Sequence, residues 1–180
     1  MPEATTCIAP LADVSAVLAR LPQPVHVVGL LGPGMAHPIL PVPEERRLKL
    51  SFHDVSSAAP GHTPPGQEHV RALLAFARRW QATGQGALLV HCWMGVSRSP
   101  AAAYIVHCAL RPGADERALA RELRALAPFA TPNARLVALA DALLGRAGRM
   151  ISAIDAIGRG AETATGWPVT WPLPGAEGKR

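Results

Sequence analysis

Cysteine is scarce in this 180-residue sequence, and its positions exclude two common structural roles. The three cysteines, Cys7, Cys92 and Cys108, are too few and too irregularly spaced for a disulfide framework, and no Cys-x-x-Cys pair suggests a zinc site. The sequence also lacks an apolar run long enough to span a membrane and the basic, then apolar, start of a secretory signal. We therefore expect a soluble cytoplasmic protein with no membrane partner, in which Cys92 stays reduced.

Charged residues are also few, at 17% of the chain against 49% hydrophobic residues, which is sufficient for a folded core. The formal net charge of +5 suits an anionic ligand. The basic residues are mostly arginines spread along the expected helices, so nucleic acid is not the expected partner. We expect one domain over residues 1–159 and a Gly/Pro-rich tail over 160–180, from which Trp167 and Trp171 could pack on the body.

Short apolar runs alternate with amphipathic stretches along the chain, which is the pattern of an α/β fold. Strands are expected at 5–10 (an edge strand), 25–32, 47–55 and 87–92, and helices at 13–20, 65–82, 99–110, 115–127 and 131–146, with 147–159 as a continuation. Thr131 is the expected N-cap of the last helix, and Asn133 fits either that helix start or a contact with the site. We expect a mostly parallel sheet flanked by helices on both faces, with the ligand at the carboxyl ends of its strands.

The segment VHCWMGVSRSP, residues 90–100, joins an expected strand to an expected helix. Cys92 ends the strand, Gly95 allows a tight turn, and Arg98 directly precedes the helix. Such a junction directs backbone N–H groups and the positive end of a helix dipole at one spot, where an anion binds. The sequence therefore predicts an anion site with a sulfur nucleophile beneath it.

A phosphate ester is the anion that suits these residues. Main-chain N–H groups and a nearby guanidinium stabilise a thiolate, which is the nucleophilic form of cysteine. Arg98 can hold two phosphate oxygens at once with its planar fork. Attack by Cys92 on phosphorus would give a cysteinyl-phosphate, which water then hydrolyses.

This mechanism needs a proton donor for the leaving oxygen, and Asp54 is the candidate. It lies at the end of an expected strand and opens a Gly/Pro/Ser-rich loop, so it would reach the same edge of the sheet as Cys92. A strand-end turn or cap is the structural alternative for Asp54. Ser99 could donate a hydrogen bond to the departing sulfur, and the His91 side chain would point into the structure and stiffen the loop.

At 91–99 the sequence HCWMGVSRS resembles the HCxxGxSRS signature loop of cysteine-dependent phosphatases of the dual-specificity type. The likeness in element order extends over about residues 25–145, and the chain looks like a compact bacterial member of that superfamily.

The resemblance implies that Cys92 is the nucleophile and that Arg98 binds phosphate. It implies that Asp54 is the general acid and that Ser99 assists release of the thiolate. It also implies a phosphate cradle of main-chain N–H groups, contributed by Trp93, Met94, Gly95, Val96, Ser97 and Arg98. The family needs no metal or other cofactor. Trp93 and Met94 depart from the residues common at their positions, and both could shape the rim of the site.

Several functions stay open at this point. The leading one is hydrolysis of phosphotyrosine in proteins or peptides, with phosphoserine and phosphothreonine left open. A phosphopeptide-binding module with weak catalysis would use the same loop, although it needs neither sulfur nor acid. A sulfur-transfer domain also uses a cysteine loop with a downstream arginine, but it has no use for a leaving-group acid. The positive charge permits a phosphatase for RNA ends or small phosphates, although no nucleic-acid motif supports it. His53, His62 and His69 are too loosely spaced to predict a metal site.

Overall fold

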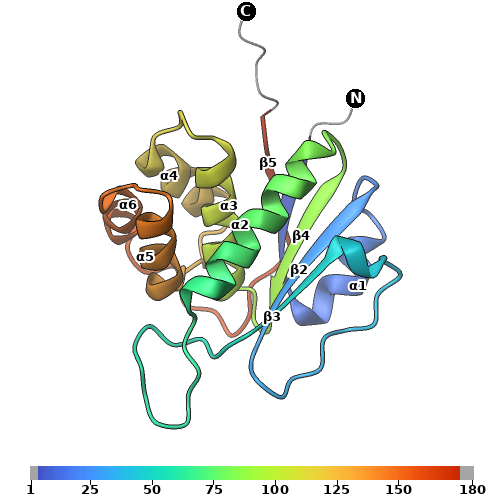
Figure 1. Ribbon diagram of the computed structural model, residues 1–180, viewed down its shortest axis with the longest axis horizontal. Helices are drawn as coiled ribbons and strands as arrows, with labels where there is room; N and C mark the ends of the chain where they lie inside the picture. Colours follow the sequence, from blue (N-terminus) through green and yellow to red (C-terminus); the bar gives the residue numbers. More distant parts are fainter. Residues whose placement is uncertain (1–3, 175–180) are drawn as a thin grey trace, which may run out of the picture.

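The computed structural model describes residues 4–174, which contain one five-stranded sheet (Figure 1). Its strands are β1 (Thr5–Pro10), β2 (Val25–Leu31), β3 (Arg47–Ser51), β4 (Ala87–Cys92) and β5 (Val169–Pro172). The order across the sheet is β3-β2-β4-β1-β5, and β5 alone runs antiparallel to its neighbour. Because β1, β2 and β4 are covered on both faces, all their residues are buried, which explains their continuous apolar runs. The expected mostly parallel sheet is confirmed.

Helices cover both faces of this sheet, as expected. In chain order the helical elements are η1 (Leu11–Asp13), α1 (Val14–Leu18), η2 (Glu44–Arg46), α2 (Gln67–Ala82), α3 (Arg98–Leu110), α4 (Glu116–Leu126), α5 (Ala134–Leu143) and α6 (Arg149–Ile157). Helices α2 to α6 pack on one face of the sheet and α1 packs on the other (Figure 1). Each face therefore has its own apolar core, and the larger core lies under the five helices.

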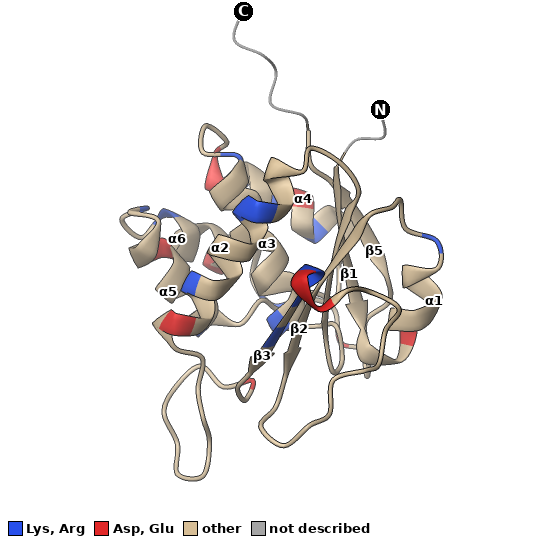
Figure 2. Ribbon diagram, turned by 45° about the vertical axis from the view of Figure 1, so that its right-hand side comes forward, with Lys and Arg blue, Asp and Glu red and all other residues tan. Residues whose placement is uncertain are grey.

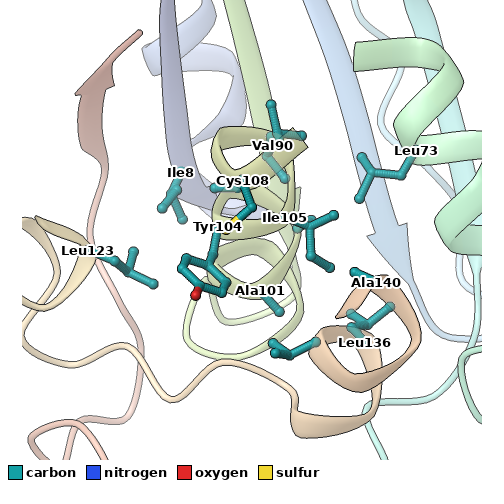
Figure 3. Packing of buried hydrophobic residues seen from close by; sticks show 14 of the residues in the cluster. Ile8, Leu73, Val90, Ala101, Tyr104, Ile105, Cys108, Leu123, Leu136 and Ala140 are labelled. Carbon is teal, nitrogen blue, oxygen red and sulfur yellow. The ribbon is translucent and has the colours of Figure 1, made fainter. Parts of the chain in front are cut away.

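Helix α3 lies at the centre of the larger core. Every residue of this helix except Ala109 is buried. Figure 3 shows Tyr104 and Ile105 between the sheet and the neighbouring helices α4 and α5. The Tyr104 hydroxyl donates a hydrogen bond to the Glu116 carbonyl at 3.1 Å, so its polar end is satisfied inside the core. The first turn of α3, which follows the candidate site, is therefore held by close packing on all sides.

The C-terminal segment differs from the expected tail. Residues 169–172 form β5, which pairs with β1, so β1 is not an edge strand and the fold continues past residue 160. Trp171 is buried and stacks on His107 with ring centroids 3.7 Å apart, and Trp167 packs edge-on against Phe129. A strand of four residues is too short for its alternation of buried and exposed side chains to be recognised in the sequence. Pro172 is tolerated because β5 lies at the edge of the sheet. Residues 175–180 of the predicted tail lie outside the described residues.

Two boundaries among the C-terminal helices also differ, because local hydrogen bonds decide them. Asn133, not Thr131, is the N-cap of α5, and its Oδ1 accepts a bond from the backbone N–H three residues later at 3.0 Å. Thr131 Oγ1 instead accepts a bond from the Gly160 N–H at 3.0 Å. The expected continuation of this helix is interrupted by Gly145 and Gly148, whose φ angles are +64° and +83°, so α6 is a separate helix.

Charges of both signs are interspersed along the helices, as Figure 2 shows. Arg111 pairs with Glu122 at 2.8 Å and Arg146 pairs with Glu116 at 2.9 Å. Some of the basic residues are therefore paired locally with acidic ones. None of the helices in residues 4–174 has the length and apolar character needed to cross a bilayer.

Acid is expected to destabilise the fold through His107. The ring is fully buried, and burial lowers its pKa to about 3. In the unfolded chain the pKa of a histidine is about 6.5, so between these two values the unfolded state binds a proton that the folded state excludes. The contribution of His107 to the free energy of unfolding is therefore complete above about pH 6.5 and is lost as the pH falls towards 3. We expect the free energy of unfolding to fall by about 1.4 kcal/mol per pH unit below about pH 6 from this group.

Denaturant unfolding between about pH 7.5 and 4.5 measures this slope. His107→Gln should flatten it by that amount, whereas His62→Gln, at an exposed position, should leave it unchanged. Equal slopes in wild type and both variants would show that His107 does not carry the acid sensitivity.

Candidate active site

A cavity of about 530 Å³ opens at the carboxyl ends of β2 and β4, where the sequence predicts the ligand. The structure brings Asp54, Cys92 and Arg98 together in its lining, although they come from different parts of the chain. The other described lining residues are Gly32, Met35, His53, Trp93, Met94, Val96, Ser97, Thr163 and Ala164. Ser99 and His91 are buried beside it, next to Arg98 and Cys92 in the chain.

Residues 92–98, hereafter the Cys92–Arg98 loop, are surrounded by other segments of the chain, which bind the carbonyl groups of the loop. Four of them accept hydrogen bonds from backbone N–H groups of those segments. The bonds run from Leu11 to Trp93 (3.2 Å), from Gly166 to Met94 (2.8 Å), from Thr131 to Val96 (2.8 Å) and from Asn133 to Ser97 (3.3 Å). In a trans peptide the N–H points opposite to the C=O, so these bonds turn the following N–H groups to the inner side of the loop.

The inward N–H groups are available to an anion. The Gly95 N–H donates to Cys92 Sγ at 3.3 Å. Within residues 4–174, the N–H groups of Met94, Ser97 and Arg98 donate to no other residue. Helix α3 begins at Arg98, and its first N–H groups have no partner inside the helix. Loop and helix together present N–H groups of the kind that bind an anion, and this arrangement is hereafter called the proposed anion cradle.

Gly95 is required by the close approach of this loop to β1. Its φ is +71°, in the left-handed region. A Cβ atom at this position would lie 2.8 Å from the Pro10 nitrogen and 3.2 Å from the carbonyl carbon of Ala9. Backbone atoms of a buried strand cannot move aside, so the loop keeps its shape only with glycine here.

Two hydrogen-bonding groups lie beside the sulfur of Cys92 at the base of the loop. The Gly95 N–H lies 3.3 Å and the Ser99 Oγ lies 3.2 Å from Sγ. Ser99 is fully buried, so packing holds its hydroxyl beside the sulfur. Hydrogen bonds to the charged form of a group favour that form, so this arrangement suits a thiolate.

The guanidinium of Arg98 is fixed by one bond and has a further donor free. Its Nη1 donates to the Phe52 carbonyl at 2.9 Å, and the side chain is only 8% exposed. Its Nε is buried, has no hydrogen-bond partner, and lies 3.9 Å from Asp54 Oδ2. A buried charged donor without a partner is unfavourable, and a bound oxyanion would supply the missing acceptor.

Asp54 lies beside the cradle, held by two donors. Its Oδ1 accepts hydrogen bonds from Ser97 Oγ and from Asn133 Nδ2, both at 2.8 Å. Asn133 thus caps α5 with its oxygen and orients Asp54 with its nitrogen, so both readings of this residue are correct. The β3 strand ends at Ser51, earlier than expected, and Asp54 belongs to the loop that follows it.

The loop that carries Asp54 is closed at its neck by His53. The His53 N–H donates to the Thr63 carbonyl at 2.7 Å, and His53 Nδ1 accepts from the Thr63 N–H at 2.8 Å. Residues 56–63 between these bonds are exposed. The neck fixes the start of the loop, where Asp54 lies, while the outer part has few contacts.

The other histidines near the site have structural contacts. The buried ring of His91 lies against His37, and burial lowers its pKa to about 4, so it is neutral. A Cβ on Gly29 would lie 2.8 Å from His91 Nε2, which shows how closely this ring packs beneath the loop. His53 and His62 touch at 5.0 Å between ring centroids. In residues 4–174, no three His, Cys, Asp or Glu side chains are grouped so that they could hold a metal ion.

Four lining residues have no signal in the sequence. Gly32 and Met35 follow β2, and Thr163 and Ala164 belong to the segment between α6 and β5. Sequence reasoning placed Thr163 and Ala164 in a tail outside the domain. They reach the cavity because β5 draws the C-terminal segment back across the sheet, a pairing between residues far apart in the chain.

Replacing Gly95 with alanine is expected to disrupt the Cys92–Arg98 loop. The left-handed φ and the clash with β1 together should lower the free energy of unfolding by about 3 kcal/mol. Gly34→Ala is the matched control, because Gly34 has a similar φ of +78° but no atom within 4 Å of its Cβ position. That change should lower stability by about 1 kcal/mol, from backbone strain alone. Equal losses of unfolding free energy in the two variants, measured by urea denaturation, would contradict the close approach of the loop to β1.

The comparisons with known proteins concern the fold. No protein-family model matches the sequence, and no curated protein matches it. Solved structures do match. Human DUSP28 is 21% identical, with a TM-score of 0.55 over 78% of this chain and 94% of its own. DUSP15 is 16% identical, with a TM-score of 0.55 over 87% of this chain and 96% of its own.

A third match is a mouse putative dual specificity phosphatase, complexed with zinc tungstate in its crystal. It is 19% identical, with a TM-score of 0.53 over 80% of each chain. Each of the three structures matches this chain over most of its length. This chain therefore has the fold of the compact dual-specificity phosphatases.

Proposed function

We propose that this protein is a cysteine-dependent phosphomonoester hydrolase that acts on phosphotyrosine in proteins or peptides, with phosphoserine and phosphothreonine as further candidates. One observation carries the proposal: Cys92 Sγ lies beneath a loop in which the N–H groups of Met94, Ser97 and Arg98 have no acceptor within residues 4–174, and Arg98 Nε is unpartnered as well. A phosphate monoester satisfies all these donors at once and presents its phosphorus to the sulfur. The shared fold with dual-specificity phosphatases supports the same function.

In the first step, the Cys92 thiolate attacks phosphorus in line with the ester oxygen. The S–P bond forms as the P–O bond to the leaving group breaks. The equatorial oxygens stay on the loop N–H groups and on Arg98 as charge develops. Asp54, protonated at the start of this step, gives its proton to the leaving oxygen.

In the second step, water attacks the phosphorus of the cysteinyl-phosphate. Asp54, now a carboxylate, takes a proton from that water as the new P–O bond forms. The P–S bond breaks, and Cys92 leaves as a thiolate. Ser99 Oγ, 3.2 Å from the sulfur, donates a hydrogen bond to the departing thiolate. Inorganic phosphate is released, and the site returns to its starting state.

The three cysteines agree with this chemistry. Cys7, Cys92 and Cys108 are all free and buried. Burial raises the pKa of Cys7 to about 11 and that of Cys108 to about 12, so both stay thiols. We propose a reducing compartment such as the cytoplasm, where Cys92 is kept from oxidation.

Asp54→Asn separates the proposed acid role from simple binding. Asparagine keeps the size of the side chain and can still accept hydrogen bonds, but it cannot deliver a proton to the leaving group. We expect kcat to fall by about 100-fold or more for phenyl phosphate, whose leaving group needs protonation. For para-nitrophenyl phosphate, whose leaving group is stable as an anion, the loss should be much smaller. Steady-state hydrolysis of the two esters measures the difference.

Two further variants complete this experiment. Cys92→Ser should abolish turnover of both esters, because the hydroxyl is a far weaker nucleophile. Asp155→Asn, at an exposed position on α6, is the matched control and should leave both rates unchanged. Equal losses on the two esters in Asp54→Asn would refute the acid role. Phosphate binding without turnover in the folded wild type would favour the phosphopeptide-binding module.

A further inference from the structure

Residues 158–168, hereafter the strap, cross the mouth of the candidate site. They join α6 to β5 and pass the carboxyl ends of the parallel strands, as Figure 1 shows at the lower edge of the sheet. Thr163 and Ala164, near the middle of the strap, line the cavity together with Cys92 and Arg98. Both are exposed, so a bound substrate could touch them.

The strap is anchored at both ends. At its start, the Arg124 guanidinium donates to the Gly158 carbonyl at 2.7 Å, and the Ala161 N–H donates to the Pro128 carbonyl at 2.9 Å. At its end, the chain enters β5, which pairs with β1. A segment held in this way forms a wall whose position is set by the fold.

The middle of the strap is bonded to the Cys92–Arg98 loop itself. The Met94 carbonyl accepts hydrogen bonds from the Gly166 N–H at 2.8 Å and from Thr165 Oγ1 at 3.2 Å. A Cβ on Gly166 would lie 2.5 Å from the Phe129 ring and 3.1 Å from the Gly95 carbonyl oxygen. The strap and the anion cradle are therefore one unit, and a substrate that enters the cradle meets the strap.

The described lining of the cavity carries no Lys, Arg, Asp or Glu apart from the reacting groups. Among the described lining residues, Arg98 is the one Lys or Arg and Asp54 is the one Asp or Glu. Residues 4–174 expose five large hydrophobic side chains, and three of them belong to the loop or the strap. They are Trp93 (51% exposed), Met94 (38%) and Trp167 (49%). Trp93 and Met94 line the cavity, and Trp167 follows on the strap that is bonded to the same loop. Exposed apolar side chains beside a cavity favour the binding of an apolar partner.

We propose that Thr163 and Ala164 contact the organic part of the substrate, and that the strap with Trp93 and Met94 selects phosphopeptides with apolar residues beside the phosphorylated one. This inference rests on the proposed function. Apolar neighbours would be buried against the exposed rim. Acidic neighbours would lose hydration without gaining a cation from the cavity lining, because Arg98, the one Lys or Arg among the described lining residues, is occupied by the phosphate. Peptides with acidic flanks should therefore be poorer substrates.

The experiment compares two phosphotyrosyl peptides that differ only in the flanking residues, leucine in one and glutamate in the other. For wild type, kcat/KM should be about tenfold higher for the leucine peptide. Ala164→Arg places a cation on the wall, so this ratio should fall about fivefold. Ala161→Arg is the same change at an exposed strap residue outside the cavity lining, and it should keep the wild-type ratio. Thermal unfolding of both variants should match wild type.

A ratio near one for wild type, or equal shifts in the two arginine variants, would overturn the inference. If wild type hydrolyses neither peptide, the proposed function fails, but the inference about the strap can still be tested. The affinities of the same two peptides for wild type and the two arginine variants then test it. A preference for the leucine peptide that Ala164→Arg alone reduces would still support the strap as the selecting wall. Equal affinities would overturn it.

Discussion

The hydrogen bonds that bind the carbonyl groups of the Cys92–Arg98 loop are the constraint on which the site depends. Four carbonyls accept bonds from residues 11, 131, 133 and 166, which belong to three different segments of the chain. Because the carbonyls are bound outside, three of the four N–H groups that follow them are left for a ligand, and the fourth, on Gly95, bonds Cys92 Sγ. The proposed anion cradle therefore depends on the whole fold, and a change in any of the three segments should alter its geometry.

The remaining parts of the site follow from that arrangement. Helix α3 extends the loop into the centre of the core, so Arg98 and Ser99 are fixed by packing, and Arg98 Nη1 is bound to the Phe52 carbonyl. Asn133 supports the loop through its N–H, caps α5 through Oδ1, and orients Asp54 through Nδ2. One residue thus couples the cradle, a helix start and the proposed acid, which makes the geometry of the site cooperative.

The sequence predicts the parts of this site that are local. An apolar strand, a cysteine, a glycine and an arginine before a helix lie within one short segment, and their chemistry can be argued without a structure. The polar contacts of Asn133 and Thr131 could not be assigned, because each depends on a segment distant in the chain. Strand β5 was missed for the same reason: Pro and Gly hide its short alternation, and only pairing with β1 makes it a strand. For that reason the position of the strap beside the cavity was not predicted either.

The most direct test of the account is to trap the phosphoryl group on the sulfur. Wild type and Ser99→Ala would be mixed with an aryl phosphate, quenched in acid within the first turnovers, and digested for mass spectrometry of the peptide that contains Cys92. The account predicts a phosphoryl group on Cys92 in both proteins, with more of it in Ser99→Ala, because loss of the hydroxyl slows departure of the thiolate. Product formation with no phosphoryl group on Cys92 in either protein would contradict the account.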